Sequence, residues 1–355
     1  METLAETASL NLPATLLLHK FHIKKLVVFR ALQIGDMLCA VPALRSLRAG
    51  FPAAHITLAG LPWAKEFAAR FNHYIDDFVA FPGHPAFPEQ PPQESTLPAF
   101  YREMRARHFD LAAQIHGNGQ ISNQIVSAFG AKTWVGFNQK NSTKIYPVSL
   151  PEYPETGAEP LRLLTLATSL GAPFLGTDLE FPLTATDFQE FNDSGVASGL
   201  TKGNYICIHP GARMRSKRWA PEQFAKVGDQ LSEKFRLPIV LTGSGKETEI
   251  TAAVAARMKT KAINAASPIS IGAMAALISS ARLLICNDTG VSHIAAGLKL
   301  PSVVIFSTVD VERWAPLNSR LHRCISDPNG TKAVDVIEQA SHLLNAIDKD
   351  RTLAQ

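Results

Sequence analysis

Residues 283–298 of this 355-residue chain read LLICNDTGVSHIAAGL, and this stretch contains the unit from which the fold is built. The apolar run 283–286 predicts a strand buried on both faces, because such strands carry continuous aliphatic residues. A polar loop follows, and the apolar spacing over 289–298 predicts a helix that begins directly after it. A strand, a loop and a helix in this order form half of a βαβ unit.

The same alternation continues in both directions from this stretch. In the C-terminal half we predict further strands at 205–208, 238–241, 262–263 and 302–306, and further helices at 221–235, 247–258, 271–280 and 334–347. In the N-terminal half we predict strands at 26–29, 55–58, 77–81 and 111–115, again with helices between them. We therefore predict an α/β chain with two parallel sheets, helices on both faces and right-handed crossovers.

The pattern weakens between Pro147 and about Asn204, where only a helix over 161–170 stands out between loose segments. A boundary between domains belongs in such a region. We expect an N-terminal extension at 1–24, a first domain at 25–175, a second at 176–332 and a closing helical segment at 333–355.

Composition and charge exclude several classes of protein. Hydrophobic residues make up 46% and charged residues 19%, which is typical of a globular chain and not of a disordered one. The net charge of +4 is too mild to indicate nucleic-acid binding, but it suits an anionic ligand. No apolar run is long enough to span a bilayer, and the basic segment 19–25 follows an apolar run, the wrong order for a signal peptide. We predict a soluble cytoplasmic protein.

Cysteine and histidine spacing gives no metal site. The chain has no C-x-x-C pair and no H-E-x-x-H, and its four cysteines are interpreted as core thiols in a reducing compartment. One D-x-D triplet, 348–350, lies in the polar tail, so we discount it as a metal ligand.

Ligands of parallel α/β sheets bind at the carboxyl ends of strands, so the loops that lead into helices are the candidate sites. The first such loop is QIGD at 33–36. Asp36 at the start of a helix has two interpretations: it caps the helix, or it faces a ligand as a general base.

The second loop, HPGARMRSKRW at 209–219, places four cations within six residues directly after a buried strand. We interpret it as a clamp for a phosphate or diphosphate. The third, TGSGK at 242–246, is a weaker phosphate signal, because Glu247 stands where a P-loop needs Ser or Thr. The absence of G-x-G-x-x-G after the first strand argues against a nicotinamide dehydrogenase.

The fourth loop is NDTGVSH at 287–293, inside the opening stretch. Backbone N–H groups at a helix start, together with the Thr289 and Ser292 hydroxyls, suit an anion. His293 falls one turn into the helix, where it is either structural or part of the site. Two anion-binding loops in one half and a carboxylate loop in the other suggest transfer of a group from a phosphorylated donor to an acceptor across a cleft.

Three motifs in this order resemble glycosyltransferase family 9, which includes the heptosyltransferases of lipopolysaccharide core assembly. The resemblance covers about residues 25–320. Its motifs are GD at 35–36 with PAL at 42–44 and FPA at 51–53, then HPG at 209–211 with SKRW at 216–219 and PEQF at 221–224, and DTG at 288–290 with SH at 292–293.

The resemblance implies a GT-B fold, in which two Rossmann-like domains face a central cleft and the last helix packs back toward the first domain. It implies an inverting transfer from a nucleotide sugar, typically ADP-heptose, with no metal or other cofactor. Asp36 is then the general base, Lys217 neutralises the donor diphosphate, and Asp288, Thr289, Gly290 and His293 form the donor loop. The loops themselves add Gly211, Gly243 and Arg218 as donor-binding candidates, and the turn after the strand at 111–115 adds His116 and Asn118 as acceptor-binding candidates.

One segment departs from the family pattern: FSTVD at 306–310 stands where the family often has F-G-P-T-D-P. The acceptor is expected to be a lipid-linked surface glycan, and the segment 19–25 could contact the inner face of an anionic membrane. Two alternatives stay open: another GT-B sugar-nucleotide enzyme, such as an epimerase, and a non-catalytic nucleotide-binding protein.

Overall fold

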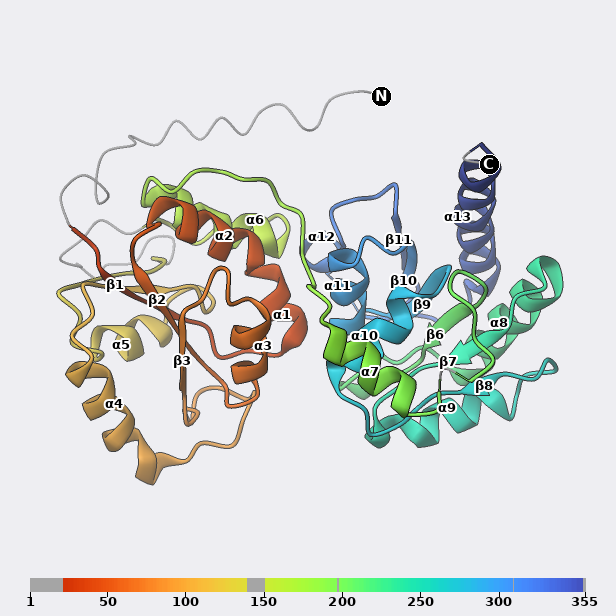
Figure 1. Ribbon diagram of the computed structural model, residues 1–355, viewed down its shortest axis with the longest axis horizontal. Coiled ribbons are helices and arrows are strands. Elements are labelled where there is room, and N and C mark those ends of the chain that lie inside the picture. Colours follow the sequence, from red (N-terminus) through yellow and green to blue (C-terminus); the bar gives the residue numbers. More distant parts are fainter. Residues whose placement is uncertain (1–21, 139–150, 197, 309, 354–355) are drawn as a thin grey trace. The chain divides into compact units, whose positions relative to one another are not determined.

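The computed structural model describes residues 22–138, 151–196, 198–308 and 310–353 (Figure 1). Most of the expected N-terminal extension therefore lies outside the described residues. The chain divides into two compact units. The first contains the described residues of Met1–Leu32, Ala40–Glu155 and Pro160–Gly176, and the second contains Gln33–Cys39, Thr156–Glu159 and those of Thr177–Gln355.

The first unit is built on a parallel sheet with the strand order β3-β2-β1-β4-β5. Its strands are β1 (Lys25–Phe29), β2 (His55–Gly60), β3 (Asp77–Ala80), β4 (Leu111–Gln114) and β5 (Thr133–Val135). Its helices are α2 (Val41–Gly50), α3 (Ala64–Arg70), the 3₁₀ turn η1 (Glu94–Thr96), α4 (Leu97–Ala106), α5 (Ser122–Ser127) and α6 (Glu159–Ser169). The four predicted strands are confirmed, whereas the three-residue edge strand β5 was not predicted.

Both faces of the first sheet are covered. Val27 and Phe29 of β1 belong to an apolar cluster that includes Phe100 of α4 and Ile125 of α5. Since side chains alternate along a strand, Leu26 and Val28 point to the opposite face, where they are also fully buried. This burial explains why β1 is a continuous apolar run.

Between β1 and β2, where a helical region is predicted, the chain forms two helices. α1 (Ile34–Cys39) and α2 are separated at Ala40, and Pro42 lies in the first turn of α2, where it costs no hydrogen bond. The two helices also belong to different units: α1 groups with the second unit, although β1 before it and α2 after it belong to the first.

The second unit contains a parallel sheet with the order β11-β10-β9-β6-β7-β8. Its strands are β6 (Ile206–His209), β7 (Ile239–Leu241), β8 (Ile263–Asn264), β9 (Leu283–Asn287), β10 (Ser302–Phe306) and β11 (His322–Ser326). Besides α1, its helices are α7 (Ala185–Asp193), η2 (Arg215–Lys217), α8 (Pro221–Phe235), η3 (Gly245–Glu247), α9 (Thr248–Ala255), α10 (Ile271–Ser279), α11 (Gly290–Gly297), α12 (Val311–Trp314) and α13 (Ala333–Leu353).

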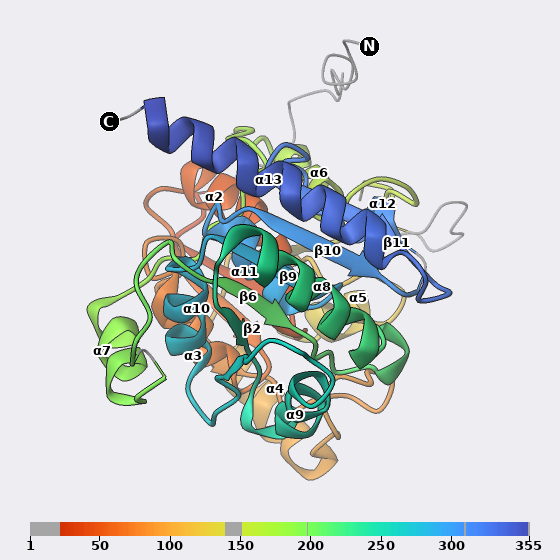
Figure 2. The same ribbon diagram turned by 90° about the vertical axis from the view of Figure 1, so that its right-hand side faces the viewer.

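Two apolar clusters cover the faces of this sheet. On one face, α8 and α13 lie side by side (Figures 1 and 2) and pack on Ile206, Ile208 and other strand residues of the same orientation. On the other face, α7, α10 and α11 pack on strand residues such as Cys207 and Cys286. These buried cysteines are core thiols, as predicted. The predicted parallel α/β class is confirmed for both units.

Several elements in the second unit were not predicted: the helix α7, the short helices η2 and α12, and the edge strand β11. The segment that we interpreted as loose, up to about Asn204, contains α7, whose start carries a capping box between Thr184 and Asp187. That T-x-x-D signal is readable from sequence and was missed. The edge strand β11 was missed because its letters, HRCIS, lack a continuous apolar run.

Candidate functional site

The chain reverses its direction of strand addition at β6, which has β7 on one side and β9 on the other. Ligands of such sheets bind in the crevice at this switch point. A cavity of about 240 Å³ lies in the second unit at the loops that follow β6 and β9. It is lined by Gln33, Ile34, Gly35, Asp36, Ala212, Arg213, Met214, Lys217, Asp288, Thr289, Gly290, His293 and Trp314.

Six of the predicted site residues line this cavity together. They are Asp36, Lys217, Asp288, Thr289, Gly290 and His293. They come from three chain segments, and the structure shows how each segment is held.

Asn287, the last residue of β9, connects the two switch-point loops. It is fully buried, and its Oδ1 accepts a hydrogen bond from the Trp219 backbone N–H at 2.9 Å. Its Nδ2 donates to the carbonyl oxygens of Pro210 at 2.8 Å and Gly211 at 3.3 Å. Sequence reasoning did not select Asn287, although an amide that ends an apolar strand needs buried partners and is a usable signal.

Lys217 and Asp288 form an ion pair in the wall of the cavity. Lys217 Nζ lies 2.5 Å from Asp288 Oδ2, and the side chains are 28% and 8% exposed. A pair this poorly solvated holds the ammonium group in one place, because either partner left alone would be a costly buried charge. The pair therefore holds the Lys217 ammonium group at the cavity, beside the loop that follows β9.

The start of α11 also lies at the cavity. Thr289 is the N-cap residue with extended backbone (φ −154°, ψ 172°), so the helix begins at Gly290. The Ser292 hydroxyl donates to the Thr289 carbonyl at 2.7 Å, so it serves the helix start and does not line the cavity as an anion ligand. The N–H groups of the first turn remain the anion-binding feature of this segment.

His293 is buried in the wall of the cavity. Its Nδ1 lies 3.7 Å from the Cys39 Sγ, and its ring meets Trp314 edge-on with centroids 6.3 Å apart. Burial lowers its pKa, and the negative charges of Asp288 and Asp36 oppose this shift without reversing it. The ring is therefore mainly neutral at pH 7, which allows it to touch an anion or a sugar without adding charge.

Asp36 is the third residue of α1, inside its first turn, and so does not occupy the capping position before the helix. Of the two interpretations of Asp36, the structure favours the carboxylate at the cavity. α1 packs directly on α11: a Cβ at Gly35 would lie 2.9 Å from His293 Cδ2 and 3.1 Å from the Gly290 Cα. Glycine at both positions allows this close approach.

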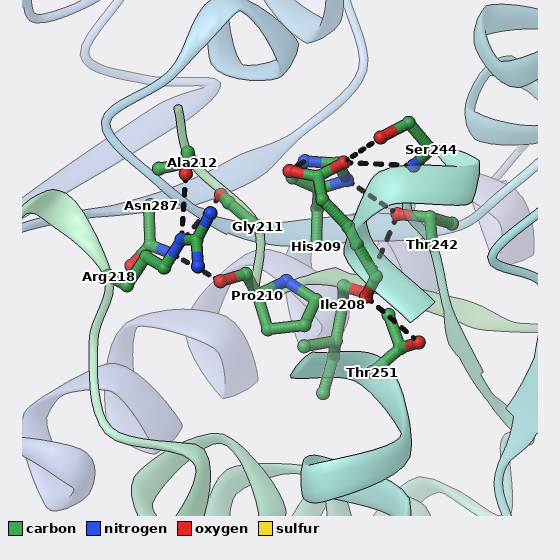
Figure 3. Close-up of polar contacts among 11 residues, drawn as sticks. Ile208, His209, Pro210, Gly211, Ala212, Arg218, Thr242, Ser244, Thr251 and Asn287 are labelled. Carbon is green, nitrogen blue, oxygen red and sulfur yellow. Dashed lines mark hydrogen bonds and ion pairs between the residues drawn. The ribbon is translucent and has the colours of Figure 1, made fainter. Parts of the chain in front are cut away.

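The loop after β7 forms a second polar cluster, shown in Figure 3. The His209 Nδ1 lies 3.1 Å from the Thr242 Oγ1, and its Nε2 lies 3.9 Å from Glu247 Oε1. Burial raises the pKa of the Glu247 carboxyl, but the charge of His209 and hydrogen bonds from Ser244 outweigh this effect and lower it. Burial lowers the pKa of His209.

Glu247 also explains Gly211, since its carboxylate occupies the space that a Cβ at Gly211 would need. Gly243 does not line the cavity. Its loop is held by a capping box between Ser244 and Glu247, so the segment 242–246 resembles a helix start more than a phosphate cradle. Arg218 does not line the cavity either, and its Nε donates to the Ala212 carbonyl at 2.7 Å.

The acceptor candidates His116 and Asn118 belong to the first unit. The His116 ring stacks between Phe29 and Phe87, with centroids 5.3 and 4.4 Å away, and its Nδ1 accepts from the Ala31 N–H at 3.1 Å. Burial, together with the charge of Arg30, lowers its pKa to about 3. Asn118 Oδ1 accepts from the Gln120 N–H. These contacts account for both residues locally, and their role in acceptor binding stays a prediction.

Within the described ranges, no group of three or more His, Cys, Asp or Glu side chains could hold a metal ion. Asp348 of the D-x-D triplet pairs with Arg282. No helix in the described part of the chain is long and apolar enough to cross a membrane.

Comparisons with known proteins agree with this architecture. The model of glycosyltransferase family 9 (heptosyltransferase) matches residues 98–342. Lipopolysaccharide heptosyltransferase 2 of Escherichia coli is 23% identical over 354 residues, which cover 93% of this chain and 97% of that protein.

Two solved structures share the fold. A glycosyltransferase family 9 protein of Veillonella parvula matches with a TM-score of 0.77 and 20% identity, covering 91% of this chain and 98% of that one. The E. coli ADP-heptose lipopolysaccharide heptosyltransferase II matches with a TM-score of 0.71 and 20% identity, covering 92% and 100%. The GT-B fold that the sequence resemblance implied is thereby confirmed.

Proposed function

Because the chain belongs to glycosyltransferase family 9, it is a glycosyltransferase, and we propose that it moves a heptose from ADP-heptose to a lipopolysaccharide-core acceptor with inversion at the anomeric carbon. The curated relatives named lipopolysaccharide heptosyltransferases support this choice of donor and acceptor. The observation that carries the proposal is the cavity where a carboxylate, a fixed ammonium and a helix start come together.

In the proposed reaction an acceptor hydroxyl attacks the anomeric carbon of the donor sugar. The bond between that carbon and the diphosphate oxygen breaks on the opposite face, which inverts the anomeric centre. Asp36 takes the hydroxyl proton onto its carboxylate, and the electron pair of the broken bond leaves with the nucleoside diphosphate. A positioned carboxylate base contributes roughly 100- to 10,000-fold to such a step.

The leaving group gains negative charge in the transition state, and something must stabilise it. Lys217 supplies a cation, and the first turn of α11 supplies backbone N–H groups and the positive end of the helix dipole. We propose that these groups do this work without a metal ion. The neutral ring of His293 then packs beside the donor, and Asp288 holds Lys217 in place.

We propose that the first unit binds the acceptor and that His116 and Asn118 are acceptor-binding residues. We also propose a cytoplasmic protein that contacts the membrane surface through its basic segment. In the described part of that segment, Lys24 and Lys25 are both exposed, and Lys25 Nζ donates to the Arg107 carbonyl at 3.0 Å. Liposome binding that is unchanged when Lys20, Lys24 and Lys25 become Gln would contradict the membrane contact.

The test is calorimetric titration with ADP-heptose and with GDP- and UDP-sugars in EDTA, followed by a transfer assay with a lipid-linked core acceptor. We expect selective micromolar binding of ADP-heptose and transfer that survives EDTA. Preference for a uridine or guanosine sugar would overturn the donor, and loss of transfer in EDTA that Mg²⁺ restores would overturn the metal-free mechanism. Membership of the family favours transfer over the epimerase and the non-catalytic alternatives.

A further inference from the structure

The four cations that follow β6 have different surroundings. Lys217 is paired with Asp288, and Arg218 donates to the Ala212 carbonyl. Arg213 and Arg215 are both exposed, but only Arg213 lines the cavity. In the described part of the chain, the guanidinium of Arg213 makes no hydrogen bond or ion pair. The four charges of this loop therefore cannot be interchangeable.

The backbone that leads to Arg213 is fixed from two sides, as Figure 3 shows. Asn287 Nδ2 donates to the carbonyl groups of Pro210 and Gly211, and Arg218 donates to the next carbonyl, that of Ala212. Three consecutive peptide groups are thus held before the chain reaches position 213. A side chain that begins from a fixed backbone loses less freedom when it binds a ligand.

The balance of charges in the cavity wall depends on Arg213. Its ionisable residues are Asp36, Arg213, Lys217, Asp288 and His293. The pKa of His293 is lowered, so the ring adds no charge at pH 7, and the two carboxylates balance the two cations. Lys217 already faces a carboxylate at 2.5 Å. Without Arg213 the wall would carry a net negative charge and would repel a diphosphate.

We propose that the guanidinium of Arg213 binds the diphosphate of the nucleotide donor, and that Arg218 is a positioning residue that acts through the Ala212 carbonyl. This inference rests on the proposed function for the nucleotide and on the cavity geometry for the anion. Arginine suits the task because its planar fork matches two phosphate oxygens at once. The four cations of this loop then have different roles. Arg213 binds the diphosphate, Lys217 is paired with Asp288, and Arg218 positions the loop. Arg215 takes no part in binding.

The experiment compares Arg213→Gln with Arg215→Gln, which removes the same charge two residues away from a side chain outside the cavity. Calorimetric titrations use ADP, ADP-heptose and inorganic pyrophosphate as probes. We expect Arg213→Gln to weaken all three by about 10- to 100-fold, the loss typical of a charged hydrogen bond. Arg215→Gln should change affinity by less than about 2-fold, and Arg213→Lys should recover only part of the loss.

Equal effects of the two substitutions would overturn the assignment, because they would show a general field of positive charge. So would wild-type affinity in Arg213→Gln. If the wild type binds pyrophosphate through Arg213 but binds no nucleotide sugar, the proposed function fails while this inference stands. If it binds ADP-heptose and Arg213→Gln binds it equally well, the inference fails while the proposed function stands.

A double-mutant cycle tests the positioning role of Arg218. If Arg218 acts through the loop that carries Arg213, then Arg218→Gln weakens diphosphate binding in the wild type but hardly changes it in Arg213→Gln. Additive losses would mean that Arg218 binds the ligand itself and would overturn this part of the proposal. Unfolding curves of each variant show whether a fold defect contributes.

Discussion

The two units share one strand order around their first strand, β3-β2-β1-β4-β5 in the first and β8-β7-β6-β9-β10 in the second, yet their switch points differ in chemistry. In the first unit, Arg30 directly follows β1 and His116 is the second residue after β4, and both make local contacts: Arg30 donates to the Ile115 carbonyl, and His116 is stacked between phenyl rings. In the second unit, the corresponding loops contribute three charged side chains, Arg213, Lys217 and Asp288, to the wall of a cavity.

The difference shows that topology offers a place for a site, while the loop residues decide whether it is used. At the end of β9, the buried Asn287 satisfies backbone groups of the neighbouring loop, and Lys217 and Asp288 line the cavity. After β4, the polar groups satisfy one another: the Gln114 amide donates to the His116 carbonyl, and so does the Ser122 hydroxyl. A saturated network of this kind gives rigidity and little reactivity.

The largest expected effect comes from Asp36→Asn. Transfer should fall about 100- to 10,000-fold, because the amide cannot accept the proton, while ADP-heptose binding by calorimetry stays within about 3-fold. Asp335→Asn is the matched control, since Asp335 is also in the first turn of a helix, α13, and is exposed. Unimpaired transfer by Asp36→Asn would remove the base from the second unit and weaken the contrast between the two switch points.

Next in size is Lys217→Ala, with an expected loss of about 100- to 1,000-fold in transfer rate and weaker donor binding. The substitution removes the cation and leaves Asp288 unpaired, so Lys217→Ala/Asp288→Asn should recover part of the donor affinity. Lys246→Ala, which removes an exposed cation from the loop after β7, should have wild-type kinetics. If Lys246→Ala is as damaging as Lys217→Ala, the cavity is not the donor site.

A smaller effect is expected from Gly35→Ala, which tests the contact between α1 and α11. The added methyl would meet a ring carbon and the backbone of Gly290, so the free energy of unfolding should fall by about 1–3 kcal/mol, and transfer should fall with it. Gly245→Ala is the control, because its nearest neighbours lie at 3.4 Å or beyond. Chemical denaturation measures both, and equal stability of the two variants would contradict the close packing of α1.

The last prediction concerns stability at acid pH. Among the described residues, burial lowers the pKa of one histidine in the first unit, His116, and of three in the second, His209, His293 and His322. Below the ordinary pKa near 6.5 the unfolded chain binds protons that the folded chain does not, so stability falls with pH from about 6.5 toward the folded values, about 3 for His116 and about 4 for His322.

His116 and His322 each contribute a slope of about 1.4 kcal/mol per pH unit within that window, and His209 and His293 act in the same direction. Hydrogen exchange at pH 6.5 and pH 5 should therefore show a steeper loss of protection in the second unit than in the first. Equal slopes would mean that the buried histidines of the second unit accept protons in the folded state. His116→Gln should flatten the slope of the first unit alone.

Local pattern was sufficient for much of the fold. The helix at 221–235 and the strand at 302–306 have the predicted bounds, since each combines an apolar pattern with a clear boundary signal: proline occupies the first helical position, and Pro301 directly precedes the strand. The short edge strands β5 and β11 were not predicted, because an edge strand is half solvated and needs no continuous apolar run. The loops at strand ends were also readable, because parallel topology determines where ligands bind.

The residues alone established the order of strands and helices, the loops rich in charge and the family, because these depend on neighbours within a few positions or on motif order. Tertiary structure decided which charges work together. It grouped α1 with the second unit, so that Asp36 lies in the cavity wall beside His293, whereas we had expected it in the first domain. It also paired Lys217 with Asp288, 71 residues away, and gave Arg218 to the Ala212 carbonyl while leaving Arg213 at the cavity. A contact such as that between Lys217 and Asp288 arises only when elements distant in sequence pack together, and no local pattern encodes which side chains they bring into contact.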